Sequence, residues 1–426
     1  MSFFGSNYSN KSPLFGDTGI PAYCLKKIGS RHILIGGGGG VAKTGVLNQI
    51  QTHLLTTEGA KKDVGFRAEC VDKFDTESMA TMNLDVACAL DEASARYVIV
   101  AGQNNYCVIY MTRGFKLSEL ENDGLSFDIK KVSQVQTDYH PSNSYQKCVR
   151  FDKNSRGKIF ATGGADGNIR IWDSQVVFRS EDGNAQPILS IPAHKSDVDD
   201  IDFASDSKSI ISLGSEGAFI WNTSTGERLF DLQFPLEIAR GFKMRSVRCT
   251  PLGNASNNTV FVTAYNSISR GTKDQSSYLT LWAFNGERNV ARPIVTKLIA
   301  KGQTISSLAV SDCGNLTAVG TMSGGVGVFD THECRRLYFS PEAHDLFVTG
   351  IEFLSRTTPS ICNDITTETP GISSGFHSAV VTLAADKTMQ LHRVPHPRTK
   401  PVSEFLLIIS IVCLFFSWLS SFLIVS

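Results

Sequence analysis

A repeated pattern of short strands constrains this sequence more than any other feature. Its clearest copy runs from Lys147 to Asp173 and contains an apolar stretch, a second stretch that ends in small residues, a tight Asp166-Gly167 turn and a final stretch that ends in Trp172-Asp173. A second copy runs from Ala193 to Asn222 and has its tryptophan at Trp221. Short strands separated by turn residues at regular intervals predict an all-β architecture built from repeated units.

The cassette resembles a WD40 repeat, in which an Asp-Gly turn joins two strands and a Trp-Asp pair ends the unit. Five degenerate copies complete the set; one starts at Pro21 and the others span Ala80–Tyr110, Phe242–Phe284, Thr304–Asp330 and Ala343–Leu391. Seven copies predict a seven-bladed WD40-type β-propeller, a fold whose radial repetition leaves only short, protected strand edges.

Some residues between the strands have structural interpretations. His194 and His344 each follow an alanine at the start of a copy, and we expect them to be hydrogen-bonded histidines that buttress their blades. The polar segments 113–146 and 355–376 have no periodicity that indicates a helix, and we interpret them as loops.

Five consecutive glycines, Gly36 to Gly40, interrupt the first copy after Ile33-Leu34-Ile35. A glycine run weakens a strand, so it indicates backbone positions that exclude side chains, often because a ligand or partner approaches closely. The run stands where other copies have a two-residue turn, and we expect the next strand to resume at Val46. A local departure from a repeated pattern is typical of a functional site.

Two phosphate-binding motifs are poor explanations of this loop. Gly37 to Thr44 nearly matches a P-loop, but Ala42 stands where the motif needs its second glycine, and no helix is predicted to follow. The Rossmann fingerprint also requires a helix directly after its glycines. A flexible hairpin loop without a role remains an alternative.

Charge and cysteine usage exclude several classes of function. The 41 basic and 41 acidic residues balance, so no electrostatic signal points to nucleic acid. None of the 10 cysteines forms a C-x-x-C pair, which leaves zinc and thioredoxin-like chemistry without support and suits a reducing cytosol. No arrangement of serine, cysteine, histidine and aspartate indicates a hydrolase, and we expect no enzyme activity involving bond chemistry.

The end of the chain predicts a membrane anchor. Residues 405–425 form an uninterrupted run without a charge, long enough for a helix to cross a bilayer of ~30 Å. Arg393, Arg398 and Lys400 precede this run, so the positive-inside rule places the rest of the chain in the cytosol. The expected organisation is a propeller over 1–394, a basic linker over 395–404 and a single transmembrane helix over 405–425.

The glycine-rich loop together with the terminal anchor resembles one family, the PREB-like WD40 guanine-nucleotide exchange factors of the endoplasmic reticulum membrane. The resemblance covers almost the whole chain. Its matching residues are Gly36 to Gly40 with Ala42 to Gly45, Asp75 to Glu77 with Ala80 to Leu84, Val135 to Asp138, Ala161 to Trp172, and Ala343-His344.

This resemblance implies a function, a partner and a site. The family exchanges GDP for GTP on the Sar-type small GTPase that starts COPII coat assembly. The implied GTPase-contacting loop consists of Gly36, Gly37, Gly38, Gly39, Gly40, Val41, Ala42, Lys43, Thr44, Gly45 and Asn48. The implied cofactor is a potassium ion, held at Gly37, Gly38, Gly39, Gly40 and Asn48, where glycine carbonyls approach a cation without steric cost.

The resemblance also implies a location. We expect a monomer with one span in the endoplasmic reticulum membrane, a cytosolic propeller, and no nucleic-acid partner. A membrane-anchored WD40 adaptor without exchange activity is the alternative, and for an adaptor the loop would be dispensable.

Overall fold

The computed structural model describes residues 14–42, 45–58, 65–91, 93–120, 124–180, 183–238, 241–252, 258–269, 275–362 and 365–396, together with Ser410, Cys413 and Leu414. The chain divides into two compact units, Met1–Val394 and Pro395–Ser426. Every strand of the described residues belongs to the first unit.

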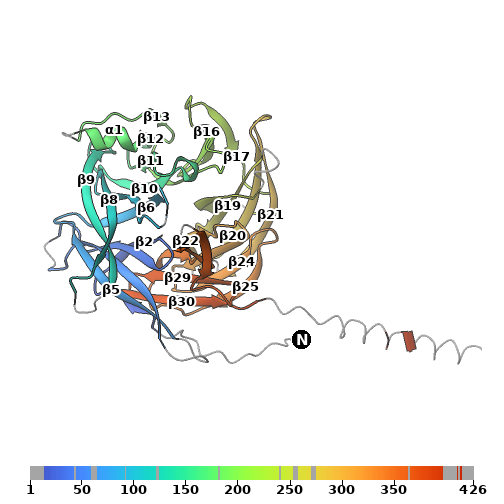
Figure 1. The fold of residues 1–426 in the computed structure, drawn as a ribbon. Coiled ribbons are helices and arrows are strands. Elements are labelled where there is room, and N and C mark those ends of the chain that lie inside the picture. Colours follow the sequence, from blue (N-terminus) through green and yellow to red (C-terminus); the bar gives the residue numbers. More distant parts are fainter. Residues whose placement is uncertain are drawn as a thin grey trace, which may run out of the picture. The chain divides into compact units, whose positions relative to one another are not determined.

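Within the described residues, seven four-stranded antiparallel sheets form the blades of a propeller (Figure 1). The first three blades are β2 (Ala22–Ile28), β3 (His32–Gly37), β4 (Gln49–Glu58) and β5 (Gly65–Asp75); β6 (Thr81–Cys88), β7 (Tyr97–Gln103), β8 (Tyr106–Leu117) and β9 (Leu125–Gln136); and β10 (Gln146–Phe151), β11 (Ile159–Gly164), β12 (Asn168–Asp173) and β13 (Leu189–Pro192). The next three are β14 (Val198–Phe203), β15 (Ser209–Gly214), β16 (Gly217–Asn222) and β17 (Arg228–Leu232); β18 (Phe242–Thr250), β19 (Asn258–Ser267), β20 (Ser276–Asn285) and β21 (Val290–Lys301); and β22 (Ile305–Val310), β23 (Leu316–Thr321), β24 (Val326–Asp330) and β25 (Arg335–Ser340).

The seventh blade combines the two ends of the propeller. Its strands are β26 (Val348–Phe353), β29 (Ser378–Ala384), β30 (Thr388–Val394) and, outermost, β1 (Gly16–Asp17). Gly16 pairs with Met389 in the register of β1 and β30. The inner strand of each blade contacts the inner strand of the next, and β26 contacts β2, so the ring is closed. This geometry confirms the predicted seven-bladed, all-β propeller.

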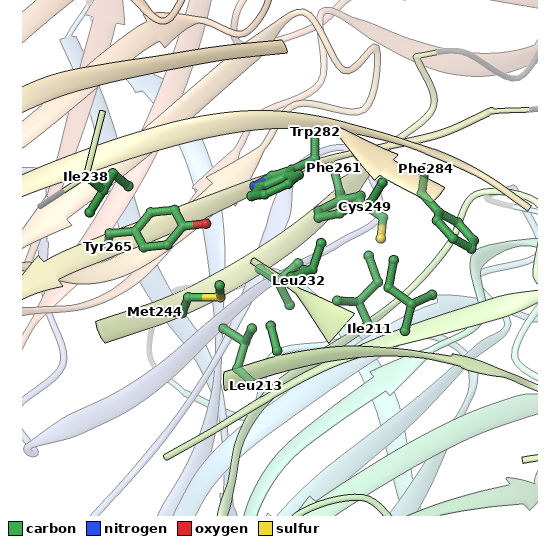
Figure 2. Packing of buried hydrophobic residues seen from close by; sticks show 14 residues of the cluster. Ile211, Leu213, Leu232, Ile238, Met244, Cys249, Phe261, Tyr265, Trp282 and Phe284 are labelled. Carbon is green, nitrogen blue, oxygen red and sulfur yellow. The ribbon is translucent and has the colours of Figure 1, made fainter. Parts of the chain in front are cut away.

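The hydrophobic core lies between neighbouring blades. Figure 2 shows one cluster, in which Ile211 and Leu213 of the fourth blade face Phe261 and Trp282 of the fifth. The rings of Phe261 and Trp282 stack with their centroids 6.1 Å apart. Burying a side chain of this size stabilises the fold by about 1.5–3 kcal/mol, and clusters of this kind recur between the other blades.

Two sequence interpretations of loops are wrong in part. The segment interpreted as the loop 113–146 contains the whole of β9 and the end of β8, and the segment 355–376 contains the hairpin of β27 (Thr357–Cys362) and β28 (Ile365–Pro370). Outer strands such as β9 are half exposed and carry polar side chains on their outer face, so they lack the apolar pattern that identifies buried strands. The chain also resumes strand structure at Gln49 rather than at Val46.

The predicted transmembrane helix, 405–425, lies outside the described residues apart from Ser410, Cys413 and Leu414. Among the residues that the structure describes, none belongs to a helix with the length and apolarity needed to span a bilayer. One short helix, α1 (Ser174–Arg179), connects β12 to β13.

Candidate functional site

The glycine-rich loop connects β3 to β4 in the first blade. Gly36 and Gly37 are the last residues of β3, and the connection itself spans 38–48, of which Lys43 and Thr44 lie outside the described residues. We use the name loop face for the side of the propeller that carries the connection 38–48, its equivalents in the other blades, and the connections between blades, among them 137–145, 233–241 and 341–347. Strand direction places the connections from second to third strand, and from one blade to the next, on this one side.

Close backbone contacts explain why side chains are excluded at the start of the loop. A Cβ atom on Gly37 would lie 2.2 Å from the carbonyl oxygen of Pro21. A Cβ atom on Gly38 would lie 2.3 Å from Asn48 Oδ1, and Gly38 also has a φ of +139°. Gly40 differs, because space is open around it and only its φ of +71° favours glycine. Glycine is therefore a structural requirement of this blade at Gly37 and Gly38, whatever else the loop does.

The side chain of Asn48 holds the loop in its conformation. The Gly40 N–H donates to Asn48 Oδ1 at 2.8 Å, and Asn48 Nδ2 donates to the carbonyl oxygens of Gly40 at 3.1 Å and of Glu77 at 2.9 Å. Asn48 itself is buried, with 4 % of its surface exposed, and the three bonds are partly buried. The predicted site residues Gly38, Gly40 and Asn48 are thus brought together, and Asn48 links the loop to the connection between the first two blades.

Residues outside the loop also hold it in place by hydrogen bonds. The Gly38 N–H donates to the carbonyl oxygen of Pro21 at 2.9 Å, and the Tyr23 hydroxyl donates to the carbonyl oxygen of Gly38 at 3.1 Å. The Thr76 N–H donates to the backbone carbonyl of Asn48 at 3.0 Å. Sequence reasoning missed Pro21 and Tyr23 as loop supports, because nothing in a strand-forming stretch signals a contact with a loop fifteen or more residues away.

The oxygen atoms of this loop are of the kind that potassium binds. They are neutral backbone carbonyls and one amide oxygen, and rings of carbonyls are how proteins replace the hydration shell of K⁺. The carbonyls of Gly38 and Gly40 each accept one hydrogen bond from a described side chain, and Asn48 Oδ1 accepts one from Gly40. Each of these oxygens has two lone pairs. The residues present therefore fit the implied ion, with one lone pair on each of the three oxygens not engaged by these contacts.

Two apolar side chains project from the loop into solvent. Val41 is 68 % exposed and Leu47 is 60 % exposed. Further large apolar side chains are exposed at other connections of the loop face: Tyr139, Phe234, Leu236, Ile268, Met322, Leu346 and Phe347. Exposed apolar groups gathered on one side of a protein are typical of a protein–protein interface. The loop thus lies on a face with the composition of a docking surface.

The two predicted buttressing histidines are structural. His194 Nε2 lies 2.9 Å from Ser212 Oγ, and Ser212 Oγ also accepts the indole N–H of Trp221 at 2.9 Å. His344 bridges Thr382 and Thr388 at 2.7 and 2.8 Å. Burial lowers the pKa of His344 to about 4 and also lowers the pKa of His194. Both rings are therefore neutral at physiological pH, and the predicted buttressing role is confirmed.

A central hollow of about 680 Å³ is lined by residues of the inner strands. Its charges pair across neighbouring blades: Lys26 lies 3.4 Å from Asp85, and Arg150 and Arg248 lie 3.3 and 2.6 Å from Asp200. Burial by itself would raise the pKa of Asp200, but Arg248 and Arg150 hold it below its usual value. These groups tie the inner strands together.

The sequence of this chain is similar to those of several known proteins. Residues 133–173 match the family described as WD domain, G-beta repeat, and this match covers the cassette from Lys147 to Asp173. The guanine nucleotide-exchange factor SEC12 of Rattus norvegicus is 26% identical to this chain over 424 residues, which are 91% of this chain and 92% of that protein. The chain is similar to SEC12 along nearly its whole length. The SEC12 of Mus musculus gives the same identity and coverage, and the predicted family resemblance is confirmed.

Solved structures with a similar fold are more distant in sequence. The crystal structure of Sqt1 from Chaetomium thermophilum has a TM-score of 0.55 and 13% identity, covering 92% of this chain and 86% of that one. The computationally designed protein Ika8 has a TM-score of 0.50 and 12% identity, covering 89% of this chain and 98% of that one. At this identity the likeness shows the fold alone.

Proposed function

We propose that this chain is a guanine-nucleotide exchange factor that activates a Sar-type small GTPase at the endoplasmic reticulum and so starts COPII vesicle budding. The observation that carries the proposal is the likeness to proteins named SEC12 guanine nucleotide-exchange factor over 91% of the chain. An exchange factor of this kind breaks no bond of the nucleotide itself. It has to bind the nucleotide-free GTPase more tightly than the GDP-bound form, because only this difference lowers the affinity for GDP.

The loop of blade one is suited to this task. Asn48 and Gly40 exchange two hydrogen bonds, so the backbone is ordered before a partner arrives, and ordering on binding then costs little. In the proposed complex, Val41 and Leu47 bury their exposed side chains against the GTPase. Gly36 to Gly40 with Val41, Ala42, Lys43, Thr44, Gly45 and Asn48 form the contacting segment near the nucleotide site.

Potassium is part of the proposal as a structural ion. Gly37, Gly38, Gly39 and Gly40 would hold it with Asn48, and when bound it would supply a fixed positive charge to the loop. The chain's own contribution is the orientation of the carbonyl oxygens, which Tyr23 and Asn48 fix by hydrogen bonds.

The proposed anchor is the apolar run 405–425, which follows the basic linker 395–404. It would hold a monomeric propeller on the cytosolic side of the endoplasmic reticulum membrane. Exchange would then be confined to the membrane into which the activated GTPase inserts.

The test is GDP release from a Sar-type GTPase, measured with residues 1–394 in solution. This segment contains the closed ring of blades and the clusters that pack between them, so it is expected to fold without the terminal segment. Alanines in place of Gly36 to Gly40 make a poor variant, because Cβ atoms at Gly37 and Gly38 would collide with backbone. The informative variant is Val41→Ser with Leu47→Ser, which removes exposed apolar groups without disturbing the core.

The matched control is Val176→Ser with Ile294→Ser, two side chains that are 50 % and 55 % exposed outside the loop face. Losing an interface anchor costs more than about 1 kcal/mol, so we expect the loop variant to slow release by roughly tenfold or more and the control to match the wild type. No acceleration by any of the proteins would favour the adaptor alternative. Equal acceleration by all three would keep exchange and remove the loop as its site.

A further inference from the structure

Four cations surround a small hollow on the second blade, away from the glycine-rich loop. The hollow has a volume of about 440 Å³, and its lining includes Arg96, Arg113, Lys130 and Lys131. Among the described residues that line it, none carries a carboxylate. We call these four residues with Met111, Thr112 and Val132 the basic hollow.

Irregular pairing of β8 with β9 brings these cations together. Ile109 pairs with Ser133 but Tyr110 pairs with Lys131, which leaves Val132 as an extra residue in β9. A second irregularity lies between Thr112 and Phe115 and leaves Arg113 and Gly114 unpaired. A β-bulge bends its strand and re-aims the side chains beside it, so Arg113 and Lys131 both come to line the same hollow.

The positive charge of the basic hollow is largely uncompensated. Lys130 lies 3.5 Å from Asp128. Within the part of the chain that the structure describes, Arg96, Arg113 and Lys131 have no carboxylate at ion-pair distance, and all three are exposed. Like charges gathered without counter-charges repel one another and attract anions. An anionic partner would therefore stabilise this arrangement.

The blade that carries the basic hollow also has exposed apolar side chains. Leu117 is 71 % exposed, Leu90 is 63 % exposed, and Phe115, Leu125 and Val132 are each at least 40 % exposed. Leu117 and Leu125 pair across the two strands near the end of the β8–β9 hairpin. Apolar groups next to lysine and arginine are the composition of surfaces that lie on anionic bilayers.

Strand direction puts this surface on the side of the propeller where the chain leaves for its terminal segment. β8 and β30 are the third strands of their blades, and both run away from the loop face. β30 ends at Val394, and the apolar run begins at Phe405. A linker of this length reaches at most about 35 Å, so an inserted anchor would keep this side close to the bilayer.

We propose that the basic hollow and its apolar neighbours form a contact surface for an anionic lipid membrane. The inference rests on the proposed anchor and does not depend on exchange activity. Phosphate groups of lipid headgroups occupy the basic hollow, and Leu90 and Leu117 enter the headgroup region. The propeller is then oriented with its loop face toward the cytosol, where the glycine-rich loop is accessible to a GTPase.

The test is co-sedimentation of residues 1–394, without the terminal segment, with vesicles of phosphatidylcholine alone or mixed with phosphatidylserine. We expect binding to the mixed vesicles that weakens as salt is raised. A basic residue near an anionic surface contributes enough that removing two weakens partitioning on the order of thirtyfold. Arg113→Gln with Lys131→Gln should therefore show this loss.

Two further variants make the test specific. Lys195→Gln with Lys301→Gln removes the same charge from exposed positions on the loop face and should bind like the wild type. Leu90→Ser with Leu117→Ser should weaken binding while leaving all basic residues in place. All variants are first compared with the wild type by thermal unfolding.

Several results would overturn the proposal. The wild type could fail to bind the mixed vesicles, or bind neutral vesicles equally well. The loop-face control could also lose as much binding as Arg113→Gln with Lys131→Gln. Binding to heparin without binding to vesicles would assign the basic hollow to a soluble polyanion instead. GDP release in solution is measured without lipid, so a failure here leaves the exchange proposal standing, and a failure of exchange leaves this one standing.

Discussion

Two hydrogen bonds of opposite direction join Asn48 and Gly40. The backbone N–H of Gly40 reaches Asn48 Oδ1 at 2.8 Å, and Asn48 Nδ2 reaches the backbone carbonyl of Gly40 at 3.1 Å. One side chain thus replaces the backbone ladder at the point where β3 and β4 separate, and the open conformation of the loop depends on it.

Replacing Asn48 by alanine should release the loop. Removing a buried hydrogen-bonding side chain costs about 1–3 kcal/mol, and the loop loses its contacts with Gly40 and Glu77. We expect a lower free energy of unfolding in urea. We also expect the acceleration of GDP release to fall by more than this loss of stability accounts for. Asn168→Ala is a matched control, since Asn168 Nδ2 bonds a backbone carbonyl in the equivalent connection of blade three at 3.0 Å. Equal exchange by the two variants would contradict the role of Asn48.

Alanine should have unequal effects at two neighbouring glycines. Gly38→Ala places a Cβ atom 2.5 Å from Asn48 Cα and 2.8 Å from the carbonyl oxygen of Leu47, so the loop has to move. Gly40→Ala meets open space and costs only the conformational strain of about 1–2 kcal/mol. Denaturant midpoints should therefore fall further for Gly38→Ala than for Gly40→Ala. The reverse order would show that the backbone contacts at Gly38 are not limiting.

Exchanging potassium for choline at constant ionic strength tests the proposed ion. We expect slower GDP release without potassium and faster hydrogen exchange of the Gly40 amide, which bonds the side chain of Asn48, another of the proposed ligands. The amide measurement needs no GTPase. In Asn48→Ala both effects should disappear. Identical amide protection in the two salts would remove potassium from the site.

The buried hydrogen bond between Trp221 and Ser212 in blade four should contribute more to the free energy of unfolding than an exposed hydrogen bond does. Ser212→Ala leaves the buried indole N–H of Trp221 without its acceptor and Nε2 of His194 without its partner. An unpaired buried polar group costs about 1–3 kcal/mol. Ser196→Ala breaks the exposed contact with Ser215 instead and should change stability by less than about 0.5 kcal/mol. Similar unfolding free energies for the two variants would contradict the buttressing role.

Stability should fall as pH is lowered from about 6.5 toward 4. Burial lowers the pKa of His344 to about 4 and of His392 to about 3. The unfolded chain, with ordinary histidines near 6.5, therefore binds more protons than the folded one in this window, so acid favours unfolding. Each histidine should cost about 2 kcal/mol between pH 7 and 5. Urea titrations across this range should show a shallower dependence for His392→Gln, and an unchanged slope would refute the assignment.

Much of the fold could be predicted from the sequence, because the motifs that identify each blade are local. The Asp166-Gly167 turn and the terminal Trp172-Asp173 identify a blade within one short stretch of chain, and the repeat carries this interpretation to weaker copies. The position of the glycine run between two strands follows from the same register. The outer strand β9 could not be predicted from the sequence, because its polar, half-exposed side chains resemble those of a loop.

The sequence by itself determined the number of blades, the buttressing histidines and the place of the loop, since each depends on residues close together in the chain. Only the tertiary structure decided which atoms hold the loop, how the ring closes and where cations gather. Asn48 Nδ2 donates to the carbonyl oxygen of Glu77 in the connection between the first two blades. Gly16 pairs with Met389 from the other end of the propeller, and Arg113 lines the same hollow as Lys131. These contacts join residues whose spacing in sequence has no period, so only the folded chain brings them together.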